Sequence, residues 1–157
     1  MTRWLTDDEL QSWLKLAGVM LKLNPALDSQ LQRDSDLTHF GYLCLAMLSE
    51  KPDRMHTMSS LAGRTNASLS RLSHVITKME KAGWVRRESI RGSRGSDAVL
   101  TDAGMAKVVE AAPPHVESVR ALVFDGLSTD QVRQLSELGS AMLTQLDKGI
   151  AAGTGRA

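Results

Sequence analysis

The spacing of apolar residues predicts a chain built mainly from helices. Over residues 6–33 apolar side chains recur every three or four positions, and Thr6 is followed by three acids, as at a helix N-terminus. Pro25 predicts a kink or a split near Asn24, because proline lacks the N–H that a helix uses there. Pro113-Pro114 predicts a similar break or kink near the C-terminal end. Further helices are predicted at about 38–50, 57–63, 68–82, 101–112 and 116–124, and from 128 onward.

The middle of the chain has the outline of a winged helix. The short turn at Arg64-Thr65-Asn66 separates the helices predicted at about 57–63 and 68–82, which is the outline of a helix-turn-helix. Strand-like runs at 84–87 and 98–100 then enclose a basic loop rich in glycine and serine, at 91–96. The predicted fold class is therefore mainly α (α+β): a winged helix-turn-helix with a two-stranded β-hairpin wing between long N- and C-terminal helices.

The charge distribution adds a function class to this outline. The 157 residues carry a formal net charge of only +1, which by itself does not favour a nucleic-acid partner. Residues 54–94, however, hold nine Lys and Arg against two Glu, a net charge of +7, while the segments on either side each carry −3. A basic stretch that coincides with a helix-turn-helix and a wing predicts a phosphate-facing surface, with an ordinary solvated basic face as the alternative.

Several classes of protein are disfavoured by what the sequence lacks. Cys44 is the single cysteine, so no internal disulfide can form, and a reducing cytoplasm is expected. The N-terminus does not have the pattern of a signal peptide, and no apolar run is long enough to predict a membrane-spanning helix. The histidines show no metal-ligand spacing, and no nucleophile motif or phosphate loop is present. We therefore expect no enzyme, no metal and no cofactor.

The helix predicted at 68–82 is the expected DNA-reading element, because its apolar and polar faces lie nearly opposite each other. Arg71 is the candidate for a base contact, with guanine as the commonest partner of arginine. Arg91 and Arg94 in the wing are candidates for the minor groove. The alternative for the helix at 68–82 is an ordinary amphipathic surface helix, and the alternative for the wing loop is a mobile surface turn. The candidate DNA contacts are Ser68, Ser70, Arg71, Ser73, His74, Lys78, Arg91 and Arg94.

These residues resemble those of the MarR family of bacterial transcriptional regulators. The resemblance rests on SLSRLS at 68–73, KMEKAGWVRR at 78–87, VLTDAG at 99–104 and the stretch 115–128. It implies a homodimer whose first and last helices intertwine, and which binds a pseudo-palindromic operator in double-stranded DNA. It also implies a repressor whose binding to DNA is relieved by a small-molecule effector. The alternatives are a winged helix used for protein contact and a non-specific architectural DNA-binding module.

The resemblance also implies how the chain is organised. We expect a single MarR-like domain over 1–157, with a DNA-binding lobe at about 38–112. Dimerisation helices are expected at about 6–33 and 113–148, and a flexible tail at 149–157. The wing departs from the family pattern, in which an Asp is closely followed by arginine.

In this wing Gly92 and Ser93 occupy the region of the usual Asp, and only Arg94 fits the arginine. In the recognition helix, His74 stands where many members have an arginine. Effectors of the family often bind between the dimerisation helices and the DNA-binding lobe. The candidates to line such a site are Trp13, Met20, His39, Tyr42 and Met47, for which plain packing in a core or interface is the alternative.

Overall fold

The computed structural model describes residues 1–154, which form two compact units, one over Met1–Ser118 and one that begins at Val119. Helices dominate both units, and the first also contains a small antiparallel sheet. The elements are α1 (Asp7–Ser35), α2 (His39–Ser49), β1 (Met55–Thr57), α3 (Met58–Arg64), α4 (Leu69–Lys81), β2 (Val85–Ser89), β3 (Ser96–Leu100), α5 (Asp102–Leu122), the 3-10 helix η1 (Phe124–Gly126) and α6 (Thr129–Ala151). The mainly helical winged helix-turn-helix predicted from the sequence is confirmed.

Hydroxyl side chains fix where most of the helices begin. In each case the hydroxyl oxygen of the residue before the helix accepts a backbone N–H from the first turn, which otherwise has no partner. At α1 and α6 the interaction is reciprocal, because a Glu or Gln side chain accepts the N–H of the capping residue. The capping residues are Thr6, Thr38, Thr57, Ser68 and Ser128.

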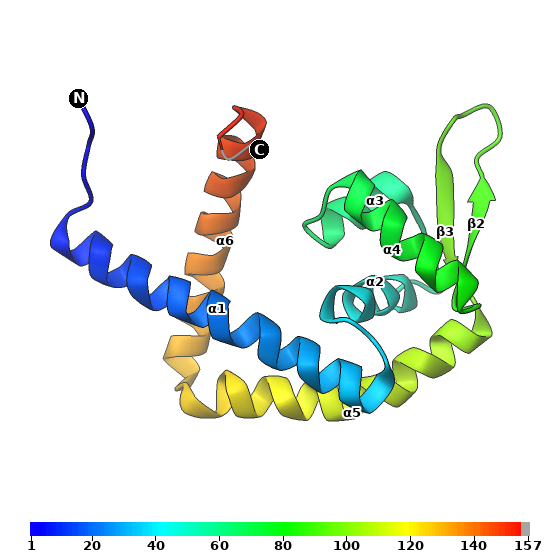
Figure 1. Ribbon diagram of the computed structural model, residues 1–157, viewed down its shortest axis with the longest axis horizontal. Helices are drawn as coiled ribbons and strands as arrows, with labels where there is room; N and C mark the ends of the chain where they lie inside the picture. Colours follow the sequence, from blue (N-terminus) through cyan, green and yellow to red (C-terminus); the bar gives the residue numbers. More distant parts are fainter. Residues whose placement is uncertain (155–157) are drawn as a thin grey trace. The chain divides into compact units, whose positions relative to one another are not determined.

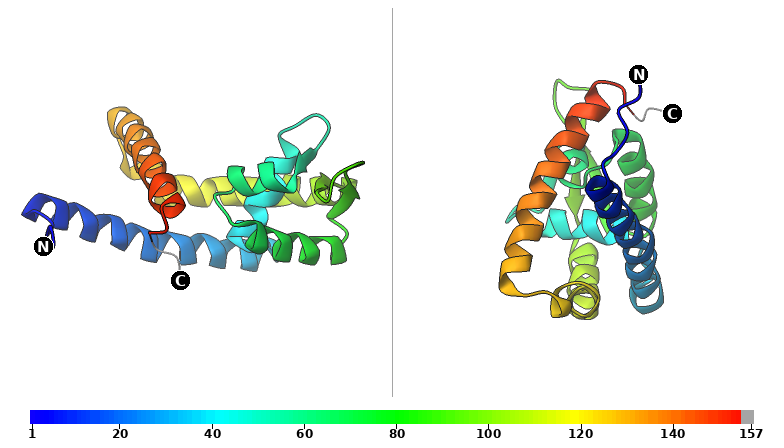
Figure 2. Two further views of the ribbon diagram at one scale, coloured as in Figure 1. Left: turned by 90° about the horizontal axis from the view of Figure 1, so that it is seen from above. Right: turned by 90° about the vertical axis from the view of Figure 1, so that its left-hand side faces the viewer.

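A kink or a split was predicted near Asn24, and a kink or a break at Pro113-Pro114; the prolines do not divide their helices, so the split and the break are wrong. Helix α1 continues through Pro25 without interruption (Figure 2), and α5 contains both of the other prolines. A proline removes the hydrogen bond to the carbonyl four residues earlier, and that carbonyl then needs another partner. Water can supply it here, because the residues that lose their partner are exposed: Leu21, Val109 and Glu110.

The sheet has the strand order β1-β3-β2, with both pairs antiparallel. The β2–β3 hairpin is the predicted wing; Val85 pairs with Leu100 at its base, and Ser89 pairs with Ser96 near its tip. Strand β1 was not predicted from the sequence; it is only three residues long and pairs with the inner part of β3. Figure 1 shows the hairpin extending beyond the rest of the lobe, beside α4.

A continuous apolar core holds the winged helix together. Its fully buried members come from α1, α2, α3, α4, β3 and α5. They include Leu31, Leu45, Leu48, Leu61, Leu72 and Ile76. Helix α6 has no buried residue among those described and ends at Ala151, so residues 149–151 of the predicted flexible tail are helical. The end of that tail, 155–157, lies outside the described residues.

Candidate nucleic-acid interface

Helix α4 is anchored to the lobe by its apolar face. Leu72, Ile76 and Met79 are buried in the core, so the opposite face of the helix is turned to solvent. The turn before α4 is fixed by Thr65, whose hydroxyl donates to the Leu61 carbonyl at 2.8 Å. The result is a rigid helix-turn-helix whose second helix presents a polar surface.

One row of residues runs along the middle of that surface. Ser70, His74, Lys78 and Lys81 are all exposed, and none forms an ion pair or a side-chain hydrogen bond within the described part of the chain. The row places a hydroxyl and an imidazole toward the start of the helix and two ammonium groups toward its end. Small hydrogen-bonding groups followed by cations are suited to base edges flanked by phosphates.

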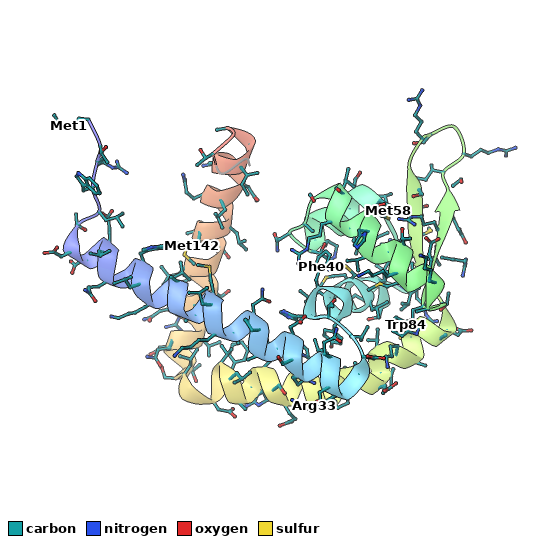
Figure 3. The ribbon with its side chains drawn as sticks, in the orientation of Figure 1. Met1, Arg33, Phe40, Met58, Trp84 and Met142 are labelled. Carbon is teal, nitrogen blue, oxygen red and sulfur yellow. The ribbon has the colours of Figure 1, made fainter. Side chains whose placement is uncertain are left out.

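Arg71 lies at one edge of this row and turns back toward the lobe. Its guanidinium carbon is 4.1 Å from the centre of the Phe40 ring, a cation–π contact with α2. Figure 3 shows Phe40 on α2 at the side that faces α4. The base contact expected of Arg71 therefore remains a prediction, and it requires the side chain to leave this ring.

The other edge of the row faces the wing. The Ser73 carbonyl and hydroxyl oxygens both accept hydrogen bonds from the Arg87 guanidinium of β2, at 2.9 Å and 3.0 Å. Ser68 also has a structural role, because its hydroxyl oxygen caps α4 by accepting the Arg71 N–H. The DNA contacts predicted for both serines are thus additional to these roles, and they remain predictions.

The wing tip carries two exposed arginines on a tight turn. The Ser93 N–H donates to the Ile90 carbonyl at 3.1 Å, and Gly92 inside this turn has a φ of 78°, a conformation that glycine adopts without strain. Arg91 and Arg94 stand on either side of Gly92 and Ser93, and neither forms an ion pair with a described residue. The tip therefore offers two free guanidinium groups with little side-chain bulk between them.

The basic stretch contains fewer free charges than its composition indicates. Four of its nine cations are paired with carboxylates: Arg54 with Asp102, Arg64 with Glu50, Arg86 with Glu88, and Arg87 with Glu80. Two of these acids, Glu50 and Asp102, lie outside the stretch, so charge counting along the sequence could not reveal the pairs. The cations without such a pair in the described residues are Arg71, Lys78, Lys81, Arg91 and Arg94.

The comparisons with known proteins agree with this geometry. Residues 37–94, from the start of α2 to the wing tip, match the model of the MarR family. The chain is 39% identical to Sco3205, a MarR family transcriptional regulator from Streptomyces coelicolor crystallised in complex with DNA. The two structures superpose with a TM-score of 0.88 over 93% of this chain and 92% of that one. The chain belongs to the MarR family.

Other MarR relatives extend the comparison. AbsC, a MarR family transcriptional regulator of Streptomyces coelicolor, is 39% identical, with a TM-score of 0.86 over 94% of this chain and 99% of that one. The transcriptional repressor MprA of Escherichia coli K12 is 28% identical over 109 residues, which are 68% of this chain and 61% of that repressor. These relatives are transcriptional regulators, and the resemblance inferred from the sequence motifs is confirmed.

A cavity of about 880 Å³ lies where the MarR resemblance predicts an effector site, between α1, α2 and α4. Its lining includes Asn24, His39, Phe40, Arg71 and His74. Of the five predicted effector residues only His39 lines it, since hydropathy and residue type do not reveal which side chains border a cavity. The other four lie elsewhere: Trp13 and Met20 are exposed on α1, Tyr42 packs on the His115 ring, and the Met47 sulfur contacts Arg64.

Two buried titratable groups, His115 and Cys44, lie in the interior of the same unit. His115 of α5 is hydrogen-bonded through Nδ1 to the Gln30 side chain at 3.1 Å, and burial lowers its pKa. Burial raises the pKa of the Cys44 thiol to about 12, so the thiolate is not populated at neutral pH. Among the described residues, no group of His, Cys, Asp and Glu side chains is arranged to hold a metal ion.

Proposed function

We propose that this MarR family protein is a sequence-specific DNA-binding transcriptional regulator that represses by occupying a pseudo-palindromic operator as a homodimer in the cytoplasm. One observation carries the proposal: the exposed row on α4 and the free arginines of the wing tip belong to the same compact unit. The row supplies hydrogen-bonding groups for base edges in the major groove. Arg91 and Arg94 supply cations for the adjacent minor groove.

The homodimer is supported by apolar residues that a single chain leaves exposed. On α1 these include Trp13 and Leu14, each with half or more of its surface accessible, and on α6 they include Leu138 and Leu146. Such stripes at helical spacing are more apolar than the surface of a stable monomer. Covering them with a second copy is consistent with two-fold symmetry, which a pseudo-palindromic operator would match. No helix of the described chain is long and apolar enough to cross a membrane.

Relief of repression by a small molecule is supported by the cavity between α1, α2 and α4. Arg71 and His74 belong both to its lining and to the polar surface of the recognition helix. A ligand that bound these side chains would compete with their use on DNA. The Phe40 ring and the Arg71 guanidinium together favour a planar anionic ligand.

The proposal is tested by selecting bound fragments from the source genome with the purified protein. The recovered site is then titrated by fluorescence anisotropy against a scrambled duplex of the same composition. We expect affinity for the selected site to exceed that for the scrambled duplex by about 10³-fold or more. Equal affinities would assign the chain to architectural binding, and no binding to either duplex would favour a protein-contact role. A mass of one chain in light scattering at micromolar concentration would contradict the homodimer.

A further inference from the structure

Arg87 is a wing residue whose side chain is bound to the recognition helix. Its Nη1 donates to the Thr77 hydroxyl at 3.1 Å and to the Glu80 carboxylate, and its Nη2 donates to the carbonyl and hydroxyl oxygens of Ser73. The Arg87 backbone N–H donates to the second Glu80 oxygen at 3.2 Å. We call these four residues the Arg87 network; it spans about two turns of α4.

The neighbouring arginine shows that this arrangement is specific to one position. Successive side chains of a strand point to opposite faces, so Arg86 is turned away from α4. Arg86 pairs with Glu88 of its own strand and keeps 57% of its side-chain surface exposed, against 25% for Arg87. Of the two adjacent arginines, one is tied to the recognition helix and one is bound only within the wing.

Because Arg87 lies in the same hairpin as the wing tip, a small rotation of the hairpin at Arg87 displaces the tip by several ångströms. Arg87 is the middle residue of β2, and Arg91 follows four residues later. At about 3.4 Å per residue Arg91 is roughly 14 Å away, so a hairpin rotation of about 15° would move it by about 3.6 Å. A hydrogen bond tolerates only a few tenths of an ångström, so such a rotation would remove the wing from its contacts. The hairpin must therefore be fixed at the level of Arg87 for the tip, which extends beyond the lobe (Figure 1), to be placed accurately.

We propose that Arg87 is a positioning residue for DNA recognition, which fixes the wing arginines relative to the exposed row of α4 through the Arg87 network. The inference rests on the proposed function, since it concerns how two DNA-binding elements act on one half-site. Arg87 is thereby assigned a role inside the protein, although its charge alone would place it among the phosphate contacts. Its planar guanidinium reaches all three partner side chains at once, which the single ammonium of lysine cannot do.

The first experiment measures the wing directly and needs no DNA. Spin labels are attached at Lys78→Cys and Ser93→Cys, labelled chains are diluted with unlabelled protein, and the distance distribution is recorded by double electron–electron resonance. The buried Cys44 thiol, with its raised pKa, is not expected to react with the label. Arg87→Lys should broaden the distribution, whereas the matched control Arg86→Lys should leave it unchanged. An unchanged distribution in Arg87→Lys would overturn the proposal.

The second experiment is a double-mutant cycle on the operator. In the native background Arg94→Ala should weaken operator binding by about 10-fold. In the Arg87→Lys background the same change should cost less than about 2-fold, because the wing tip is no longer held in the groove. In the Arg86→Lys background the 10-fold effect should persist. An Arg94→Ala effect as large in the Arg87→Lys background as in the native one would contradict the positioning role.

The salt dependence separates positioning from direct phosphate contact. The comparison is made in the Arg91→Ala/Arg94→Ala background, where the contacts of the wing tip are already absent. If Arg87 neutralised a phosphate, adding Arg87→Met to this background would still reduce the slope of log affinity against log salt by about 0.9 per half-site. If Arg87 only positions the wing, adding Arg87→Met should leave the slope of this background unchanged. Thermal unfolding checks that each variant is folded, and Glu80→Gln tests the same network from the helix side. If the native protein binds the operator no more tightly than scrambled DNA, the proposed function is refuted. The spin-label measurement, which uses no DNA, would still decide whether Arg87 positions the wing.

Discussion

The salt dependence of DNA binding depends on how many cations are free to displace counterions from phosphate. Composition counts nine Lys and Arg in residues 54–94, but four are held in ion pairs, which leaves five in each subunit. With about 0.9 counterions released per phosphate contact, a dimer that uses all five has a slope of about −9. Using all nine would give about −16. We therefore expect affinity to fall by no more than about 500-fold between 100 and 200 mM salt.

A pair of substitutions tests the reasoning at single residues. Lys81→Ala removes a free cation from α4 and should make the slope shallower by about 1.8, counting both subunits, with equal losses on operator and scrambled DNA. Arg54→Ala is the matched control, because Arg54 is bound to Asp102 at 2.8 Å and should change the slope by less than half as much. Anisotropy titrations at five salt concentrations give each slope. A native slope near −16, or equal changes in the two variants, would refute the assignment of free and paired cations.

Three further predictions concern base recognition by Arg71, close packing at Gly104 and the pH dependence of stability. Arg71→Ala should cost about 1–3 kcal/mol on the operator and relax preference at one base pair, as measured on single-base variants; the same loss on scrambled DNA would argue against a base contact. Gly104→Ala would place a Cβ 2.1 Å from the Trp84 carbonyl oxygen and should lower the free energy of unfolding by about 3 kcal/mol, while Gly63→Ala, which meets nothing within 4 Å, should not. Because burial lowers the pKa of His115, the unfolded chain binds more protons than the folded chain just below pH 6.5, so urea denaturation should show stability falling as pH drops through this range. His115→Gln should reduce that fall, to which the lowered pKa values of His39 and His56 also contribute. An unchanged pH profile would exclude a contribution from His115.

The helix starts were predictable because their causes are local. Thr38, Ser68 and Ser128 each accept an N–H from three residues ahead, so the sequence contains both partners of the interaction. Gly83 is similar, since its φ of 80° ends α4 in a conformation that favours glycine. The prolines were not predictable in this way, because whether a helix tolerates Pro25 depends on access of water to a carbonyl, which only the folded chain determines.

The candidate site was predicted less completely than the fold. A helical wheel places Arg71 on the polar side of α4, but it does not reveal Phe40 of α2 beside it. Counting charges along the chain cannot separate Arg87, bound to Glu80 across the gap between strand and helix, from the free Arg94. Both facts depend on neighbours brought close by tertiary packing, and both change the role of the residue concerned.

The pairing of four cations has a consequence for specificity as well as for affinity. Phosphate contacts strengthen binding to operator and to other DNA alike, so each paired arginine lowers non-specific affinity without removing any base contact. Of the five free cations, Arg71 lies near the start of α4 against the Phe40 ring. The other four lie toward the end of α4 and at the wing tip: Lys78, Lys81, Arg91 and Arg94. If both clusters contact phosphates as proposed, they would fix one orientation on the duplex, which a single uniform patch would not. Ser70 and His74, toward the start of α4, would then meet the same base edges at every encounter. Discrimination among sequences would rest on their hydrogen bonds and on the base contact predicted for Arg71.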